Sequence, residues 1–303
     1  MSYAYRLSTL KVVSDIELPE LVPWSGACDE PDQVFFRVGD IPHALTKPGP
    51  TDNHSQAIGG SRYLFTLNNK SKVLIENGRD VVIEPAPGAD PTDVRAVLMG
   101  PVQAVLWHQR GLLPLHASVV SVNGRAVALA GPSGVGKSTF AAVFSQKKHA
   151  VLADDLCIVD TSDGAVVLPS TPRLRLWRDA LEHFGIPLIG LPRALSRNEK
   201  YIVEGRWDEA QEQRLAAVIL LSRRACGEVT MRRLYGWRSF SALQSVVHMF
   251  GAARSLGLEA ANFTALEKVF GEGVTVWDLL VPEDLVCIDE AAEKVLSTMH
   301  GCT

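Results

Sequence analysis

The stretch Gly131-Pro132-Ser133-Gly134-Val135-Gly136-Lys137-Ser138 fits the pattern G-x-x-x-x-G-K-[ST]. It follows an apolar run that predicts a strand and precedes a helical pattern over about 138–146. In a strand–loop–helix of this kind, backbone N–H groups surround phosphate oxygens, the lysine reaches the terminal phosphates and the hydroxyl binds Mg²⁺. The stretch therefore predicts an α/β fold with a nucleotide-binding loop. The residues expected to contact ATP are Gly131, Ser133, Gly134, Val135, Gly136, Lys137, Ser138 and Thr139, with Ser138 also on Mg²⁺.

A hairpin leads into this loop. The apolar runs Ala117–Val122 and Arg125–Ala130 are separated only by Asn123-Gly124, the strongest short hairpin signal. The strand before the loop is therefore expected to have an antiparallel neighbour. P-loop kinases of small molecules usually begin a parallel sheet with that strand, so the hairpin favours a different class.

Two adjacent carboxylates follow the next predicted strand. Asp154 and Asp155 come directly after Ala150–Ala153, and 17 and 18 positions after Lys137. A strand beside the loop would deliver them to the metal and the γ-phosphate, where one carboxylate could act as a base and the other could bind the metal. The alternative interpretation is a solvated turn or a helix N-cap, because Asp is common in both.

A histidine and several cations flank these motifs. His116 stands 21 positions before Lys137, and spacing alone leaves a structural role open. The cations downstream of the acidic pair could neutralise charge on a transferred phosphoryl group. They could equally be exposed surface charges. The candidates are Arg173, Arg175, Arg197 and Lys200.

Taken together, Leu115-His116-Ala117, the Asn-Gly hairpin, the 131–138 loop and Leu152-Ala153-Asp154-Asp155 resemble the catalytic domain of HPr kinase/phosphorylase. That bacterial family phosphorylates a serine of a sugar-transport phosphocarrier and shares its core fold with phosphoenolpyruvate carboxykinase. The resemblance is close from about 113 to 155 and weaker to about 201. It implies that Asp154 is the general base, Asp155 the metal-side carboxylate, His116 a partner of the base and Lys137 a catalytic cation.

The chain departs from that family in two respects. Thr139 stands where the best-known members have a glutamate, and the glycine-rich segment tied to the phosphorylase reaction is absent. The sequence looks more like divergent relatives with a different N-terminal domain, some of which phosphorylate a serine of a ribosomally made peptide. The resemblance also raises the expectation of a homo-oligomer.

The N-terminal part reads differently from the rest. Short alternating runs such as 34–38, 63–67 and 80–84 predict a β-rich module over residues 1–91, with the P-loop kinase domain over 92–303. A proline-rich stretch at 84–91 ends the module. After it, Thr92 is expected to cap a helix that runs to about Leu106 and is interrupted at Gly100-Pro101. Further helical patterns cover about 239–250, 260–270 and 289–299.

Composition excludes several classes. The chain has 303 residues, 47% of them apolar and 21% charged, which is typical of a folded, soluble protein. A net charge of −4 argues against nucleic acid as a partner. Five scattered cysteines without a C-x-x-C pair argue against a disulfide framework or a zinc site. No apolar run is long enough for a membrane span, so the predicted location is the cytoplasm.

The leading hypothesis is an ATP- and Mg²⁺-dependent kinase that phosphorylates a serine hydroxyl of a protein or peptide. A P-loop kinase of a small molecule is the second hypothesis. The third is a nucleotide-gated binding or regulatory protein without efficient hydrolysis.

Overall fold

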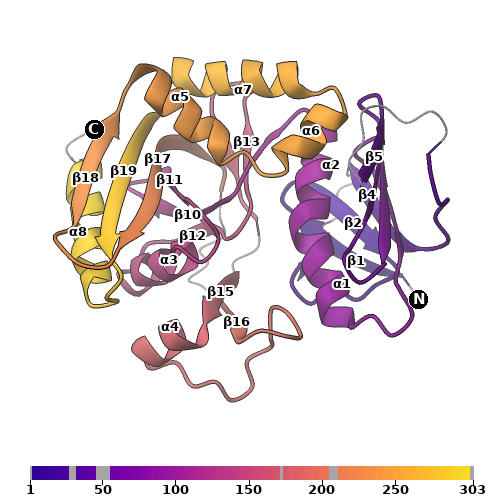
Figure 1. Cartoon of the computed structure of the whole chain (residues 1–303), viewed down its shortest axis with the longest axis horizontal. Coiled ribbons are helices and arrows are strands. Elements are labelled where there is room, and N and C mark those ends of the chain that lie inside the picture. The colour runs from indigo at the N-terminus through magenta and orange to yellow at the C-terminus, as the bar shows by residue number, and fades with distance from the viewer. Residues whose placement is uncertain (1, 27–31, 46–54, 171–172, 205–210, 301–303) are drawn as a thin grey trace. The chain divides into compact units, whose positions relative to one another are not determined.

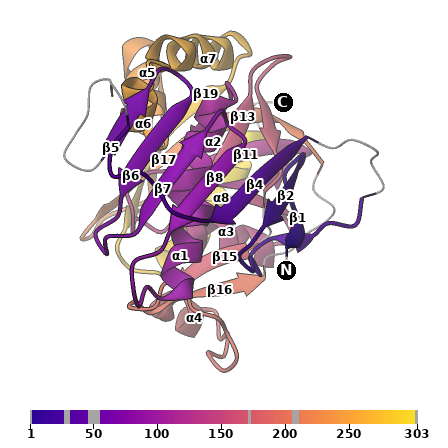
Figure 2. The ribbon, with the colours of Figure 1, turned by 90° about the vertical axis from the view of Figure 1, so that its right-hand side faces the viewer.

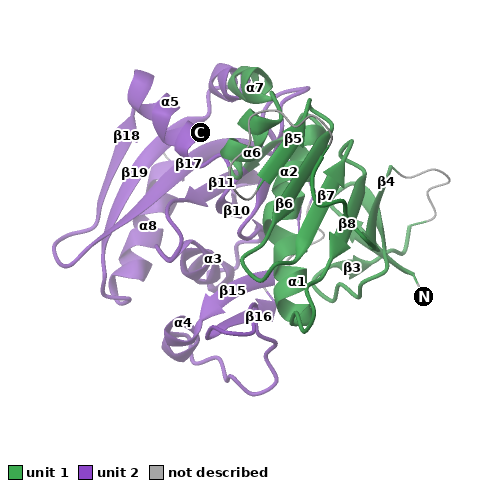
Figure 3. Cartoon of the chain, turned by 45° about the vertical axis from the view of Figure 1, so that its right-hand side comes forward, with its two compact units in different colours: residues 1–114, 248–265 green, residues 115–247, 266–303 purple. Residues whose placement is uncertain are grey.

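Figure 1 shows the computed structural model, a mixed α/β protein with several sheets. It describes all residues except 1, 27–31, 46–54, 171–172, 205–210 and 301–303. The chain divides into two compact units, which Figure 3 shows in different colours. Unit 1 comprises residues 1–114 and 248–265, and unit 2 comprises residues 115–247 and 266–303. None of the helices in the described part of the chain is long and apolar enough to cross a membrane.

Unit 1 contains one eight-stranded sheet, whose strands lie in the order β3-β1-β2-β4-β8-β7-β6-β5 (Figure 2). The pairs β2–β4 and β4–β8 are parallel and the others are antiparallel. These strands lie in the stretch for which the sequence analysis expected a β-rich module. The strands are β1 (Tyr3–Leu7), β2 (Leu10–Ser14), β3 (Val22–Pro23), β4 (Gln33–Val38), β5 (Ser55–Ile58), β6 (Arg62–Thr66), β7 (Lys72–Glu76) and β8 (Asp80–Glu84).

The helical segment after this sheet is α1 (Pro91–Val97), a π-helical turn η1 (Leu98–Val102) and α2 (Gln103–Gln109). Its N-cap is Asp90, whose carboxylate accepts from the backbone N–H of Thr92; the expectation that Thr92 caps the helix is therefore wrong. The interruption at Gly100-Pro101 is confirmed: Pro101 lacks an N–H donor, and the backbone forms the wider π turn around it.

Side-chain bonds tie the end of α2 to the turn between β7 and β8. The side chain of Gln109 accepts from Gly78 N at 2.7 Å, and Arg110 Nη1 donates to Gly78 O at 2.9 Å. Residues 91–114 therefore group with the N-terminal strands, whereas the sequence analysis placed the division at residue 91. Helix α6 (Phe250–Ser255) also belongs to unit 1, and His108 on α2 bonds to the backbone oxygen of His248.

Unit 2 has a sheet whose path is β12-β10-β11-β17-β14-β13, with β19 and then β18 extending it from β17. The central strands β11, β17 and β19 are parallel. Strand β9 (Leu113–Leu115) contains the boundary between the units. The strands of unit 2 are β10 (Ala117–Val122), β11 (Arg125–Ala130), β12 (Val151–Ala153), β13 (Cys157–Asp160), β14 (Val166–Leu168), β17 (Gln213–Arg224), β18 (Thr230–Leu234) and β19 (Thr275–Pro282). A separate two-stranded sheet pairs β15 (Arg173–Trp177) with β16 (Lys200–Glu204).

The predicted hairpin is confirmed residue by residue. Strands β10 and β11 pair antiparallel, from Val122 opposite Arg125 to Ala117 opposite Ala130. Asn123 and Gly124 both have positive φ, at 53° and 73°, as a two-residue type I′ turn requires.

The helices of unit 2 are α3 (Lys137–Gln146), α4 (Arg178–His183), α5 (Gly236–Ser245) and α8 (Cys287–His300); α7 (Glu259–Gly271) contains the boundary at residues 265 and 266. Phe140 and Phe144 of α3 are fully buried with Leu129 and Ile219 of the sheet and Val295 of α8. Burial of each large apolar side chain contributes about 1.5–3 kcal/mol, so this core holds α3 against the strands.

The helix expected over 239–250 is shorter in the structure. Helix α5 ends at Ser245, and Val246 O then accepts from the backbone N–H of His116 at 2.7 Å. Val247 forms an isolated bridge with Leu115. Pairing with the backbone around His116 thus replaces the last helical turn that the periodicity predicted.

Candidate active site

The loop that follows β11, residues 131–138 (the glycine loop), depends on three glycines with positive φ. Their φ angles are 142° at Gly131, 83° at Gly134 and 105° at Gly136, a region that other residues rarely adopt. Two of these positions also lack room for a side chain. A Cβ at Gly131 would lie 2.7 Å from Leu221 O, and one at Gly136 would lie 2.7 Å from a guanidinium nitrogen of Arg223.

The remaining residues expected to contact nucleotide occupy the loop and the first turn of α3. Within the loop, Ser133 is exposed and Val135 is buried. Ser138 is half-buried, and Thr139 is buried. The loop thus offers its exposed backbone and the N-terminus of a ten-residue helix, which carries partial positive charge, to an anion.

Lys137 folds back over the loop. Its side chain is only 7% exposed, and Nζ donates to Gly131 O at 2.9 Å and to Pro132 O at 3.1 Å. Burial lowers the pKa of Lys137, and the charge of Lys200 adds to that effect while Asp155 opposes it. The amine is therefore held against the loop rather than extended into solvent.

His116 links the lysine to the acidic pair. Its Nε2 lies 3.0 Å from Lys137 Nζ, and its Nδ1 lies 3.0 Å from the backbone oxygen of Asp155. Because an ammonium only donates, Nε2 is the acceptor and Nδ1 carries the proton. Burial lowers the pKa of His116, and the neighbouring charge of Lys137 lowers it further. The ring is therefore neutral at physiological pH.

Asp154 lies at the end of β12 and is 8% exposed. Ser118 Oγ donates to its Oδ1 at 2.5 Å, and the backbone N–H of Arg175 donates to its Oδ2 at 2.8 Å. Each carboxylate oxygen keeps a second lone pair, so the group can still accept a proton.

Asp155 has a φ of 71°, which turns the chain between β12 and β13. Its carboxylate bonds to different partners from those of Asp154: Oδ2 pairs with Arg175 Nη1 at 2.9 Å, and Oδ1 lies 3.7 Å from His116 Nδ1. The Asp155 side chain is 25% exposed, so it is the more accessible of the two carboxylates.

The four candidate cations fall into two groups. Arg175 contacts both aspartates, and Lys200 at the start of β16 is close enough for its charge to lower the pKa of both Lys137 and His116. Arg173 is half-buried on the same strand as Arg175, and Arg197 is exposed before β16. In the described part of the chain, neither makes a hydrogen bond or ion pair with the aspartates, His116 or Lys137.

Two residues of this site were not among the sequence candidates. Ser118 holds Asp154, and its only sequence signal is its place two residues after His116, near the start of β10. Arg223 at the end of β17 donates from Nε to Val135 O at 3.0 Å and from Nη1 to Pro282 O at 2.7 Å, so it braces the glycine loop. Burial lowers the pKa of Arg223. Only the pairing of β17 with β11 brings it there.

The residues present fit a magnesium nucleotide. The glycine loop can surround phosphate oxygens, and a Cβ at Gly131 or Gly136 would not fit. Lys137 supplies a cation against the loop. Within the described residues, no cluster of three or more His, Cys, Asp or Glu side chains forms a metal cage. Mg²⁺ bound with a nucleotide needs no such cage, because one or two protein oxygens and the phosphates complete its shell. Ser138 and Asp155 are the available oxygens.

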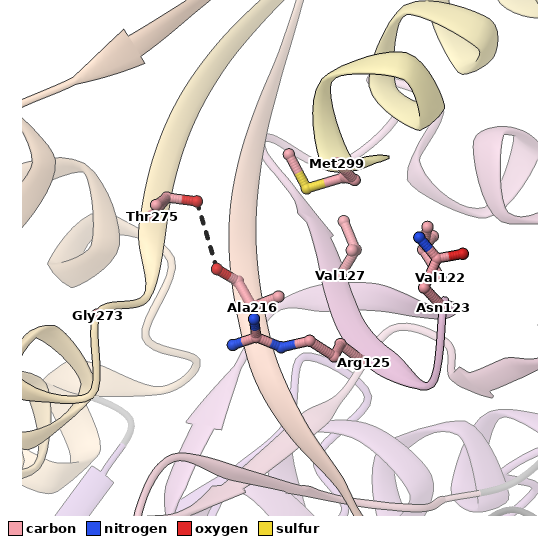
Figure 4. Close-up of a pocket in the computed structure, with 8 residues that line it drawn as sticks. All are labelled: Val122, Asn123, Arg125, Val127, Ala216, Gly273, Thr275 and Met299. Carbon is pink, nitrogen blue, oxygen red and sulfur yellow. Dashed lines mark hydrogen bonds between the residues drawn. The ribbon is translucent and has the colours of Figure 1, made fainter. Parts of the chain in front are cut away.

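A pocket elsewhere in unit 2 does not belong to this site. It has a volume of about 70 Å³ and is lined by residues that include Arg125, Ala216, Thr275 and Met299 (Figure 4). Arg125 begins β11 and Thr275 begins β19, whereas the glycine loop follows the end of β11. The pocket therefore lies at the N-terminal ends of the parallel strands, and the glycine loop lies at their C-terminal ends.

Comparisons with known proteins were made at the level of sequence and of structure. The chain matches no protein-family model and no curated protein. Among solved structures, it is similar to the Hpr(Ser) kinase/phosphatase from Coxiella burnetii, with a TM-score of 0.31 and 11% sequence identity, over 62% of this chain and 96% of that one.

Proposed function

We propose that the protein is an ATP- and Mg²⁺-dependent kinase that transfers a phosphoryl group to a serine hydroxyl of a protein or ribosomally made peptide. One observation carries the proposal. Lys137, His116 and Asp155 form a connected group beside the glycine loop, and Arg175 joins it to Asp154. A lysine and two carboxylates around a phosphate-binding loop are the groups that phosphoryl transfer needs. The serine acceptor rests on the resemblance to the HPr kinase family.

In this proposal the glycine loop and the N-terminus of α3 bind the phosphates, with Lys137 against the terminal ones. ATP would supply the phosphoryl group, and Mg²⁺ held by Ser138 and Asp155 would offset its charge. Arg175, on Asp155, and Lys200, near Lys137 and His116, add further positive charge to the site.

Asp154 accepts the proton of the acceptor hydroxyl in this proposal. Ser118 and the backbone of Arg175 keep its carboxylate in one orientation, which a positioned base requires. His116 stays neutral and keeps Asp155 and Lys137 at a constant separation. Positioning and charge stabilisation then supply most of the rate enhancement.

The test is to incubate the full chain with Mg²⁺ and γ-labelled ATP, and to offer an HPr-type phosphocarrier or a precursor peptide encoded beside its gene. The matched pair of variants is Asp154→Asn, which removes the base, and Asp160→Asn, an aspartate outside the site on β13. We expect label on a serine of one acceptor, lost in the first variant and kept in the second.

Two outcomes contradict the proposal. Transfer to a small molecule but to neither polypeptide would assign the site to the second kinase class. Tight ATP binding without transfer to any acceptor, equally in wild type and Asp154→Asn, would indicate a nucleotide-gated binding protein.

A further inference from the structure

Strand β18 is an edge of the unit 2 sheet. Its residues Thr230–Leu234 pair antiparallel with β19, and β18 has no other partner among the described strands (Figure 1). The outward N–H and C=O groups of an edge strand can hydrogen-bond a further extended chain. Proteins either shield such an edge strand from further pairing or use it to bind another extended chain.

The side chains of this edge are cationic. Arg232 and Arg233 are adjacent, so they lie on opposite faces of the strand, and both are exposed. Arg232 pairs with Asp278 at 3.1 Å on its face. The guanidinium of Arg233 lies over the ring of Tyr235 at 5.2 Å from the ring centre. Arg238 follows on α5 and is also exposed. A segment seated along the edge would therefore meet an exposed arginine on each face, that of Arg232 being shared with Asp278.

Aromatic side chains continue the surface past the end of the strand. Tyr235 is 68% exposed and Trp237 is 73% exposed, values that are high for rings of this size. Trp237 stacks on Phe240 with ring centres 5.9 Å apart, so its position is defined. Exposed aromatics beside cations are typical of surfaces that bind polypeptide.

A second copy of the chain fits this edge poorly. In an antiparallel pair of two β18 strands related by two-fold symmetry, any register centred on 232 or 233 sets arginine opposite arginine. Like charges directly opposite each other destabilise a strand pair. Acidic residues at the same positions would instead be attracted to both arginines, so charge favours an acidic segment.

The edge also leads towards the candidate active site. Met231 pairs with Leu279, and Leu279 pairs with Leu221. Leu221 in turn lies against Gly131, where the glycine loop begins. A segment added to β18 would lie one strand further out, and neighbouring strands are about 4.8 Å apart, so four strand spacings, roughly 19 Å, separate that segment from the loop. Roughly six extended residues span that distance.

We propose that β18 binds an extended acidic segment of the polypeptide substrate by strand addition, with Arg232 and Arg233 on its acidic side chains and Tyr235 and Trp237 on a flanking apolar residue. The acceptor serine then lies at least about six residues outside the bound segment. The assignment of the segment to a substrate rests on the proposed function. Its extended and acidic character is inferred from β18 and its two arginines alone.

The experiment measures binding to the full chain without ATP, by fluorescence anisotropy at physiological ionic strength. The probes are two labelled short peptides of valine and threonine, one with a central Glu-Glu pair and one with Lys-Lys. The variants are Arg233→Glu on the edge, Arg238→Glu on the exposed face of α5, and Arg125→Glu as an exposed control three strands away. Circular dichroism and nucleotide binding check that each variant is folded.

We expect wild type to prefer the acidic peptide about tenfold or more, Arg233→Glu to lose or reverse that preference, Arg238→Glu to weaken it, and Arg125→Glu to keep it. Equal binding of both peptides would overturn the proposal, as would equal losses in Arg233→Glu and Arg125→Glu. So would a dimer, seen by light scattering, that Arg233→Glu dissociates. If the acidic peptide binds as expected but no phosphoryl transfer is found, the result contradicts the proposed kinase function and leaves the binding site at β18 standing. If phosphoryl transfer is found but the acidic peptide is not preferred, the result contradicts the binding site at β18 and leaves the kinase function standing.

Discussion

Nζ of Lys137 lies 3.0 Å from Nε2 of His116, so the amine that faces the glycine loop is hydrogen-bonded to a neutral imidazole. The arrangement holds only while Nε2 is unprotonated, because a protonated ring has no acceptor and repels the ammonium. The proton state of one histidine therefore decides whether the lysine keeps this hydrogen bond in addition to those with Gly131 O and Pro132 O.

The first prediction concerns pH. The pKa of His116 is lowered from 6.5 by burial and then by Lys137, so the ring gains its proton only below pH 6.5. We expect kcat/KM for phosphoryl transfer to fall as the pH drops below about 6.5. His116→Gln, whose amide oxygen can accept from Lys137 without titrating, should shift that loss towards the range where carboxylates titrate, near pH 4. Identical acid limbs in both proteins would rule out His116 as the titrating group.

The second prediction separates the two aspartates. Asp154→Asn replaces the two hydrogen bonds to the buried carboxylate by weaker neutral ones, with the new NH₂ group facing Ser118 Oγ, and should cost about 1–3 kcal/mol of unfolding free energy as well as transfer. Asp155→Asn loses a partly exposed ion pair, so its cost should be about 1 kcal/mol or less. Its main effect should be a higher Mg²⁺ requirement. Urea unfolding and Mg²⁺ titration of transfer measure the two effects, and a reversed order of destabilisation would contradict the assignment.

The third prediction compares two glycines of the loop. Both Gly131 and Gly134 have positive φ, so alanine at either adds backbone strain of about 1–2 kcal/mol. Only at Gly131 does the new Cβ also meet backbone, at 2.7 Å from Leu221 O, while at Gly134 it meets open space. Gly131→Ala should therefore lower the melting temperature more and weaken nucleotide binding more than Gly134→Ala. Equal effects on melting would show that the loop relaxes freely away from β17.

The fourth prediction concerns stability in unit 1. Burial lowers the pKa of His108 from 6.5 to about 4, and its Nε2–H donates to the backbone oxygen of His248. Between about pH 4 and 6.5 the unfolded chain binds a proton that the folded chain does not, so stability is complete above that window and is lost as the pH falls through it.

From pH 7 to pH 5 this one histidine should cost about 2 kcal/mol. His108→Gln removes the titration and should flatten the difference between urea unfolding curves at the two pH values. His149→Gln, the same substitution at a half-buried histidine of unit 2, serves as the comparison. An unchanged pH slope in His108→Gln would refute the assignment.

Local features were the most predictable parts of the fold. The hairpin at Asn123-Gly124 and helix α3 occur where the sequence indicates them, because turn geometry and helix initiation depend on neighbouring residues. The cap at Asp90 was missed because Asp and Thr are both good caps and only two positions apart. The early end of α5 was missed because helical periodicity continues through Val246, while pairing beside His116 draws that residue away.

The candidate site was predictable in its members but less so in its contacts. Lys137, Asp154 and Asp155 stand out by motif and spacing. Ser118 and Arg223 do not, since a serine in a strand and an arginine at a strand end are both common. Their roles come from strands 36 and 88 positions away in sequence from the residues that they hold.

By itself, the sequence determined the glycine loop and the hairpin before it, because positive φ at Asn-Gly and at three glycines is a property of those residues. It also determined which charged groups were available. The tertiary structure decided which of them meet: β15 presents Arg175 to both aspartates and leaves Arg173 aside, β17 brings Arg223 to the loop, and burial sets the proton on His116. Those outcomes depend on strand pairing and on desolvation, and both arise only when distant segments pack together.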